Sequence, residues 1–193
     1  MKQRLAILAS GSGSNAEGIL GFFDDHDEID VVFVGCNRPE AAAGVYEKSR
    51  RWGVETTHIT KQQLASGQLQ SMLNELEVNW VILAGFLLKI PTALVQAFHG
   101  RMLNIHPSLL PNFGGEGMYG GHVHSAVSDA GVTESGMTVH WVTENYDEGE
   151  IVFQASCEIE AHEAPDSIAA KVQALEHQYF PRVIAQVIQS QMS

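Results

Sequence analysis

Asn104-Ile105-His106-Pro107-Ser108-Leu109-Leu110-Pro111 is the stretch that decides how the fold of this 193-residue chain is interpreted. The residues before it, Arg101-Met102-Leu103, are typical of a buried strand. Asn104 and His106 are two positions apart, so on a strand their side chains point to the same side. The two prolines prevent a strand or helix from continuing beyond this point. The sequence thus predicts two polar side chains at the end of a strand, where open α/β sheets bind ligands.

Short apolar runs alternate with helical signals along the first hundred residues. Such alternation favours parallel β-α-β units with right-handed crossovers. We therefore predict an α/β fold with a Rossmann-like open, mostly parallel twisted sheet and helices on both faces. The predicted strands cover residues 5–9, 31–35, 54–59 (near an edge) and 78–83. The first predicted helix ends near residue 24, and the next ones cover residues 41–52, 61–76 and 92–98.

The pattern changes after Pro111. Residues 112–121 form a glycine-rich loop that is long enough to suggest a function. A helix is predicted over 122–129, then two strands over 137–143 and 150–158 whose connection resembles a hairpin, which favours an antiparallel C-terminal edge. The last helix is predicted from about 165 to 189, with Pro181 kinking or dividing it. We interpret residues 1–193 as a single domain.

Composition narrows the possible partners. The net charge of −12 argues against nucleic acid and against anionic membrane surfaces, but not against small anions held by backbone N–H groups. Cys36 and Cys157 have neither disulfide nor metal spacing, which favours the reducing cytoplasm. His122 and His124 are the only suggestion of a metal pair, and no cysteine or carboxylate cluster supports it. We therefore expect no metal.

A glycine-rich turn, Ser10-Gly11-Ser12-Gly13-Ser14-Asn15, follows the first strand. We expect Ser14 or Asn15 to cap the next helix, so that bare N–H groups at its positive end can cradle a phosphate. The turn also matches a loose dinucleotide fingerprint, but that fingerprint requires an acid at the end of the second strand. Cys36-Asn37-Arg38-Pro39 stands there instead, so a phosphate monoester fits better than NAD. A tight turn without a ligand remains a third interpretation.

Several motifs in order and spacing resemble one known family, the phosphoribosylglycinamide formyltransferases within the folate-dependent formyltransferase superfamily. The likeness covers nearly the whole chain, and the Asn-Ile-His-Pro-Ser-Leu-Leu-Pro block alone marks the superfamily. The early Gly-Ser-Asn turn and the late Glu-His pair narrow the resemblance from the superfamily to the phosphoribosylglycinamide formyltransferases. The motifs occupy residues 11–15, 84–86, 104–111, 139–143, 147–149 and 176–177.

The resemblance implies a specific activity: the formyl group of 10-formyltetrahydrofolate passes to the amine of glycinamide ribonucleotide in purine synthesis. It implies a phosphate-binding half over about residues 1–100 and a catalytic and folate-binding half over about 101–193. The implied catalytic residues are Asn104, His106 and Asp147. The implied substrate-binding residues are Gly13, Ser14 and Asn15 at the phosphate, and Gln173 and Glu176 at the ribose or glycinamide end. The implied folate-pocket residues are Phe86, Leu87, Leu88, Lys89, Ile90 and Val142.

The chemistry expected of these residues follows from the reaction. An amine that attacks a formamide-like carbonyl creates a tetrahedral oxyanion, which requires hydrogen-bond donors. Asn104 donates from its amide, and His106 donates when protonated. Asp147 orients the imidazole or a water molecule that shuttles the proton. Ser108 lacks the Gly-x-Ser-x-Gly setting of a nucleophile, so we expect direct transfer without a covalent intermediate.

The sequence departs from the family pattern at two places, and three other functions are alternatives to formyl transfer to the ribonucleotide. Leu87-Leu88-Lys89 stands where the family often has an arginine, and Gly114-Gly115-Glu116-Gly117-Met118-Tyr119 replaces a commoner Gly-Leu-His pattern. The alternatives are a formyltetrahydrofolate hydrolase, a methionyl-tRNA formyltransferase and a non-catalytic nucleotide-binding module. We expect only small-molecule partners, no nucleic acid and no membrane, in a monomer or a homodimer.

Overall fold

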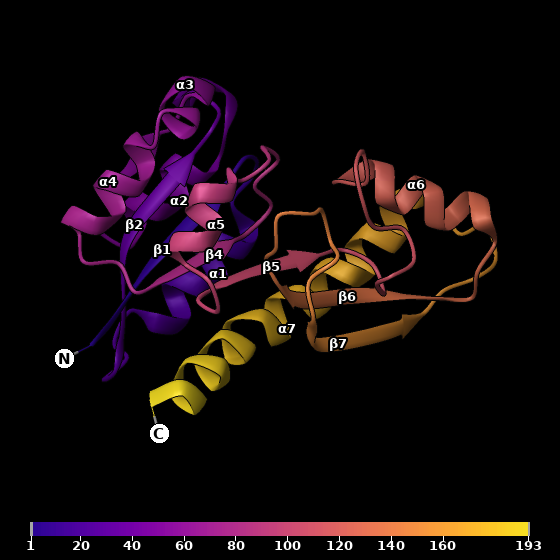
Figure 1. Cartoon of the computed structure of the whole chain (residues 1–193). Helices are drawn as coiled ribbons and strands as arrows, with labels where there is room; N and C mark the ends of the chain where they lie inside the picture. The colour runs from indigo at the N-terminus through magenta and orange to yellow at the C-terminus, as the bar shows by residue number, and fades with distance from the viewer. Residues whose placement is uncertain (1, 193) are drawn as a thin grey trace.

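The computed structural model describes residues 2–192, in which seven strands form one sheet in the order β3-β2-β1-β4-β5-β6-β7 (Figure 1). The strands are β1 (Gln3–Ala9), β2 (Ile29–Cys36), β3 (Thr56–His58), β4 (Trp80–Leu83), β5 (Met102–His106), β6 (Glu134–Trp141) and β7 (Ile151–Glu158). The helices are α1 (Ser14–Phe23), the 3-10 turn η1 (Glu40–Ala42), α2 (Val45–Arg51), α3 (Lys61–Ala65), α4 (Gln68–Glu75), α5 (Thr92–Ala97), α6 (Gly121–Ala130) and α7 (Pro165–Met192).

The sheet changes direction at β5. Strands β3, β2, β1, β4 and β5 run parallel, whereas β6 pairs antiparallel with β5, and β7 pairs antiparallel with β6. This confirms the predicted fold class, including its antiparallel C-terminal edge and the edge position of β3. The order of the strands reverses between β1 and β4, and such a reversal opens a crevice at the carboxyl ends of the strands.

Each face of the sheet has its own hydrophobic core. Alternate residues of β1 separate the two cores: Leu5 and Ile7 face one, and Ala6 and Leu8 face the other. Helices α1, α2, α6 and α7 contribute to the first core, and α3, α4 and α5 contribute to the second. β1 and β4 are buried on both sides, which explains why their sequences are continuous apolar runs.

Three predicted helices differ from the structure at their boundaries. The helix predicted over 41–52 is divided into η1 and α2, with Gly44 as the N-cap of α2. The helix predicted over 61–76 is interrupted at Gly67, whose φ of 81° suits glycine and not a continuing helix. Of the two outcomes predicted at Pro181, a kink or a division of the last helix, the division is wrong, because α7 is continuous through that residue.

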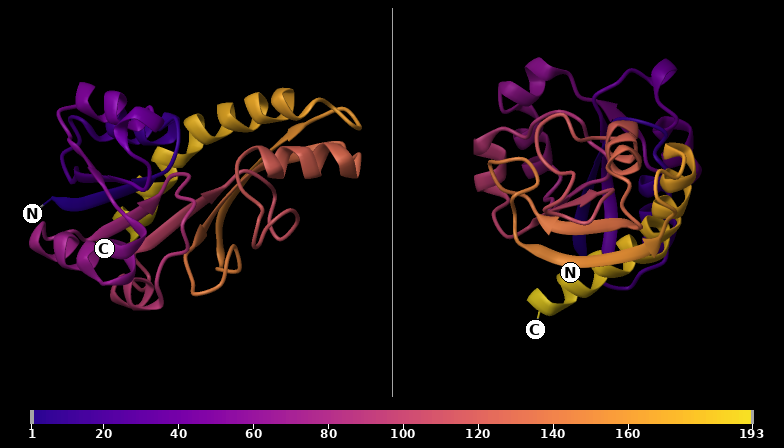
Figure 2. Two further views of the ribbon diagram at one scale, coloured as in Figure 1. Left: turned by 90° about the horizontal axis from the view of Figure 1, so that it is seen from above. Right: turned by 90° about the vertical axis from the view of Figure 1, so that its right-hand side faces the viewer.

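Helix α7 packs against elements from both halves of the chain. It runs diagonally across the molecule and packs against α1, α6 and the strands from β5 to β7 (Figure 2). Through these contacts, residues near the C-terminus reach the glycine-rich turn near the N-terminus. No helix within residues 2–192 has the length and apolar character needed to cross a bilayer.

Candidate active site

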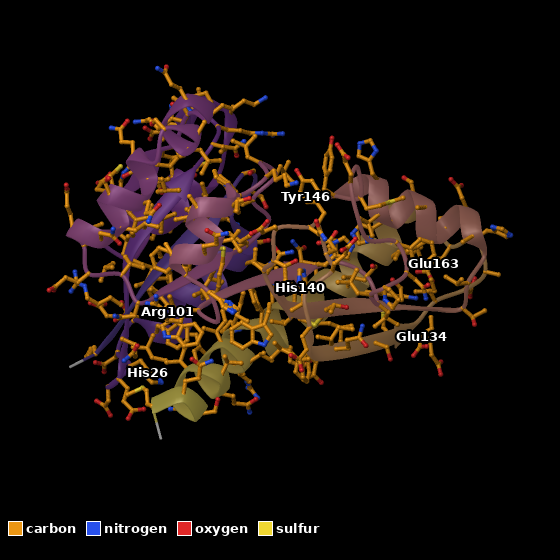
Figure 3. The ribbon with its side chains drawn as sticks, viewed as in Figure 1. His26, Arg101, Glu134, His140, Tyr146 and Glu163 are labelled. Atoms are coloured by element: carbon orange, nitrogen blue, oxygen red, sulfur yellow. The ribbon has the colours of Figure 1, made fainter. Side chains whose placement is uncertain are left out.

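A cavity of about 790 Å³ opens along the carboxyl ends of β1, β4 and β5. Figure 3 shows His140 near the centre of the molecule, with Tyr146 above it on the loop that follows β6. The sequence predicted ligand binding at the end of β5, and Asn104 and His106 both line this cavity. Its other walls come from the glycine-rich turn, the loop after β4, the loop 115–120, the loop 142–147 and the first three turns of α7.

His106 is hydrogen-bonded at one ring nitrogen and lies beside a carboxylate at the other. Its Nε2 lies 2.8 Å from the backbone oxygen of Phe113, and its Nδ1 lies 3.4 Å from Oδ2 of Asp147. Because a carbonyl only accepts, Nε2 carries a proton, and the proton that the ring can exchange is the one on Nδ1. Burial lowers the pKa of His106, while the Asp147 carboxylate and the Phe113 carbonyl oppose that effect.

Asp147 sits in an unusual backbone conformation, with a φ of 54°. Aspartate tolerates this left-handed region better than most residues, and such geometry gathers at functional sites. Its Oδ2 accepts a hydrogen bond from the backbone N–H of Gly115 at 2.9 Å. Burial alone would raise the pKa of Asp147, but His140, His106 and that N–H together hold it below the ordinary value. The carboxylate is therefore ionised beside His106.

His140 links Asn104 to Asp147, a connection that sequence reasoning did not find. Its Nδ1 donates to the backbone oxygen of Trp141 at 2.9 Å, and its Nε2 lies 2.9 Å from the amide nitrogen of Asn104, which donates to it. Nε2 also lies 3.5 Å from Oδ1 of Asp147. One hydrogen of the Asn104 amide is thus engaged, and the second can serve a ligand.

The glycine-rich turn is held between α2 and α7. Gly13 itself is the N-cap of α1, with φ 73° and no side-chain cap, so the expected cap by Ser14 or Asn15 is wrong. A Cβ on Gly13 would lie 2.6 Å from Cα of Val45, because α2 packs directly against the turn. This close contact, together with the positive φ, explains the glycine.

Helix α7 fastens the first turn of α1 by two side-chain hydrogen bonds. Gln173 donates to Oγ of Ser14 at 3.0 Å, and Asn15 donates to Oε2 of Glu176 at 2.8 Å. Asn15, Gln173 and Glu176 line the cavity, whereas Gly13 and Ser14 do not. The wall there is completed by Ser10 and Gly11, which were not among the predicted site residues.

Burial of Glu176 makes the charged form of this residue costly. The residue is 9% exposed, and burial raises its pKa, with partial compensation from the Asn15 hydrogen bond. The folded-state pKa therefore lies above the unfolded value, so the stability contributed by this group is present below about pH 4.5 and is lost as the pH rises through the folded pKa.

The variant Glu176→Gln tests whether the buried charge of Glu176 lowers the stability of the protein at high pH. The glutamine oxygen can still accept from Asn15, but no charge is buried at high pH. We expect the variant to have a higher Tm than the wild type at pH 8, with the difference shrinking toward pH 5, as measured by calorimetry. Glu75→Gln, an exposed carboxylate on α4, serves as the control. A pH-independent difference in Tm would contradict the assignment.

The predicted folate segment forms another part of the cavity wall. Phe86, Leu87, Leu88, Lys89, Ile90 and Val142 all line it. The backbone N–H of Leu87 donates to Oγ of Ser10 at 2.8 Å, which fastens this loop to the glycine-rich turn. Lys89 lies 5.4 Å from the centre of the Tyr146 ring, at cation–π distance. Arg38, at the end of β2, is the second cation on the cavity wall, and the sequence did not single it out.

Among the described residues, no group of three or more histidine, cysteine, aspartate or glutamate side chains is arranged to hold a metal ion. The pair His122 and His124 is separated by the geometry of α6, because residues two apart on a helix point in nearly opposite directions. His122 is exposed, with its ring 5.1 Å from that of Tyr119, whereas His124 is buried.

Comparison with known proteins agrees with this geometry. A model of the formyl transferase family matches residues 3–184. The chain is 37% identical to a chloroplastic phosphoribosylglycinamide formyltransferase of Arabidopsis thaliana, covering 99% of this chain and 67% of that protein. It is 36% identical to the chloroplastic enzyme of Vigna unguiculata, covering 95% of this chain and 60% of that protein. The chain thus spans about two thirds or less of these plant proteins.

Solved structures show the same relationship. The crystal structure of phosphoribosylglycinamide formyltransferase from Anaplasma phagocytophilum superposes with a TM-score of 0.88 at 29% identity, over 98% of this chain and 89% of the other. The region matched by the family model, residues 3–184, includes every strand of the sheet and the cavity at the carboxyl ends of its strands. On its sequence, its fold and the family match, this chain belongs to the formyl transferase family, among the phosphoribosylglycinamide formyltransferases.

Proposed function

We propose that this chain transfers the formyl group of 10-formyltetrahydrofolate to the amine of glycinamide ribonucleotide, a step of purine synthesis. The observation that carries the proposal is the convergence of Asn104, His106 and Asp147 on one cavity. That cavity has room for two substrates and connects the glycine-rich turn with the loop after β4. The ribonucleotide would lie along the turn and α7, and the folate along residues 86–90 and Val142.

The proposed mechanism is a direct transfer. The neutral amine attacks the formyl carbon, and the carbonyl oxygen becomes an oxyanion that receives hydrogen bonds from Asn104 and, when His106 is protonated, from its Nδ1–H. Asp147 holds the imidazolium through its charge, and a proton from the attacking nitrogen is passed to the folate nitrogen as the carbon–nitrogen bond breaks. Ser108 is unsuited to covalent catalysis, because its hydroxyl is buried and donates to the backbone oxygen of Asn112 at 2.7 Å.

The charges on the cavity wall fit two anionic substrates. The protein has a net charge of −12, so its global field opposes both of them. Arg38 and Lys89 are the cations on the wall, one beside the glycine-rich turn and one on the folate side. We infer that Arg38 faces the phosphate and Lys89 the carboxylates of the folate tail, in place of the arginine that the family often carries near residue 88.

Replacing Lys89 by methionine keeps most of the side-chain volume and removes the charge. We expect KM for the folate to rise about fivefold, which corresponds to about 1 kcal/mol for an exposed charge pair. KM for the ribonucleotide should not change. Steady-state kinetics with each substrate varied separately measures both values, and Lys61→Met, on α3 and outside the cavity wall, is the matched control. Equal changes for both substrates would contradict the assignment of Lys89.

A formyl-transfer assay with the purified chain tests the function itself. Release of tetrahydrofolate is followed with and without glycinamide ribonucleotide. The proposal predicts release only when the amine is present. Release that ignores the amine identifies a hydrolase, and binding of the ribonucleotide without any release identifies a non-catalytic nucleotide-binding module.

A further inference from the structure

His124, on α6, is a buried histidine without a hydrogen-bond partner. The residue is 8% exposed, and its Nδ1 is buried with no partner. Neither ring nitrogen bonds to any residue in the range 2–192. Buried polar groups in native proteins are nearly always paired, and leaving one unpaired is costly. An unpaired histidine at this depth therefore calls for a partner that the protein chain itself does not supply.

The position of His124 shows where that partner would lie. The residue lines the catalytic cavity and is close enough to His106 for the two rings to repel each other electrostatically when charged. It also borders a small recess with Asp166 and Ala169, in the first turns of α7. This is the helix whose Gln173 and Glu176 fasten the glycine-rich turn. His124 thus lies beside the first turns of α7, the part of the cavity wall where the proposed function places the ribonucleotide.

The chemistry of His124 suits a neutral polar group. Burial lowers the pKa of His124, and a charge on nearby His106 lowers it further, so the ring is neutral at pH 7. A neutral imidazole offers one donor and one acceptor. The glycinamide end of the ribonucleotide carries an amine and an amide, both neutral in the reactive form, and both able to pair with such a ring.

We propose that His124 is a binding residue for the glycinamide end of the amine substrate, and that its ring nitrogens acquire their hydrogen bonds only when that substrate is present. The proposal rests on the proposed function and adds a residue to it. It also gives a role to one half of the histidine pair that suggested a metal in the sequence.

Replacing His124 by phenylalanine tests the proposal, because this change keeps an aromatic ring and removes both nitrogens. A histidine that stabilises the free protein through hydrogen bonds would lower Tm when replaced. An unpaired histidine awaiting a ligand gives the opposite result: we expect the Tm of the free variant to equal or exceed that of the wild type. We expect Kd for glycinamide ribonucleotide, measured by calorimetry without folate, to rise at least about tenfold.

Three further measurements sharpen the test. KM for the folate should not change in His124→Phe. His124→Asn, which restores an amide near the position of Nδ1, should recover part of the affinity for the ribonucleotide. His122→Phe, on the same helix but outside the catalytic cavity, should match the wild type in Kd and in both KM values.

Two results would overturn the proposal while leaving the proposed function intact: an unchanged Kd for the ribonucleotide in His124→Phe, or equal losses for both substrates. A fall in Tm with unchanged kinetics would assign His124 to the structure instead. If the wild-type chain neither binds the ribonucleotide nor transfers the formyl group to it, the proposed function fails first, and the ligand proposed for His124 fails with it.

Discussion

Replacing His106 by alanine is expected to lower kcat by about a hundredfold to a thousandfold, the usual effect of removing one oxyanion donor. The residue is fixed by Phe113 and Asp147, so its loss removes a donor that is already positioned before the substrate arrives. KM should change little, because the donor acts on charge that develops in the transition state. Stopped-flow or steady-state formyl transfer measures both values.

Ser108→Ala is the matched control for this variant. It lies two residues further along the chain, in the loop that follows β5, and its hydroxyl donates to a backbone oxygen outside the catalytic cavity. We expect it to keep the wild-type kcat. A near-normal kcat in His106→Ala would refute the assignment of the oxyanion donor, and a large loss in Ser108→Ala would point to an effect of loop structure.

Asp147→Asn is expected to reduce kcat by on the order of a hundredfold or more. The carboxylate favours the protonated form of His106, so its removal lowers the pKa of that histidine further. Activity that depends on the imidazolium falls as the pH rises through this pKa. In the variant, the alkaline limb of the profile of kcat/KM against pH should therefore move to lower pH.

The asparagine oxygen can still accept from the N–H of Gly115, so the loop contact is kept and the charge alone is removed. Glu148→Gln, the next residue along the chain, is the control, because Glu148 is exposed and pairs only with Asn145 among the residues from 2 to 192. An unshifted alkaline limb in Asp147→Asn would show that the carboxylate does not govern His106.

The fold could be predicted as far as local sequence patterns determine it. β1 and β4 could be identified because both their faces are buried, which requires continuous apolar sequence. The breaks at Gly44 and Gly67 could not be located, because an isolated glycine is tolerated in many helices and only tertiary packing decides where a helix ends. The division considered at Pro181 does not occur for a related reason: the packing of α7 on the sheet outweighs the hydrogen bond that the proline cannot make.

The site was less accessible to sequence reasoning than the fold. Asn104 and His106 were found from their spacing on one strand, whereas Asp147 was suggested only by resemblance, since an acid in a turn is usually solvated. His140 and His124 each required three-dimensional information. The contacts of His140 depend on Asp147, and the surroundings of His124 include Asp166, and both of these acids are distant in sequence from the histidines. Arg38 carries no pattern beyond its place at the end of β2.

The hydrogen bond from Gly115 to Asp147 couples the position of the loop 115–120 to the protonation state of the Asp147 carboxyl group. Since this N–H favours the ionised carboxylate, the loop 115–120 is held more firmly when Asp147 is charged and less firmly once it takes up a proton. Thermodynamic reciprocity makes the converse equally true: pulling the loop away makes Asp147 a stronger base. A proton arriving at this carboxylate would thus also loosen the loop 115–120, which lines the cavity.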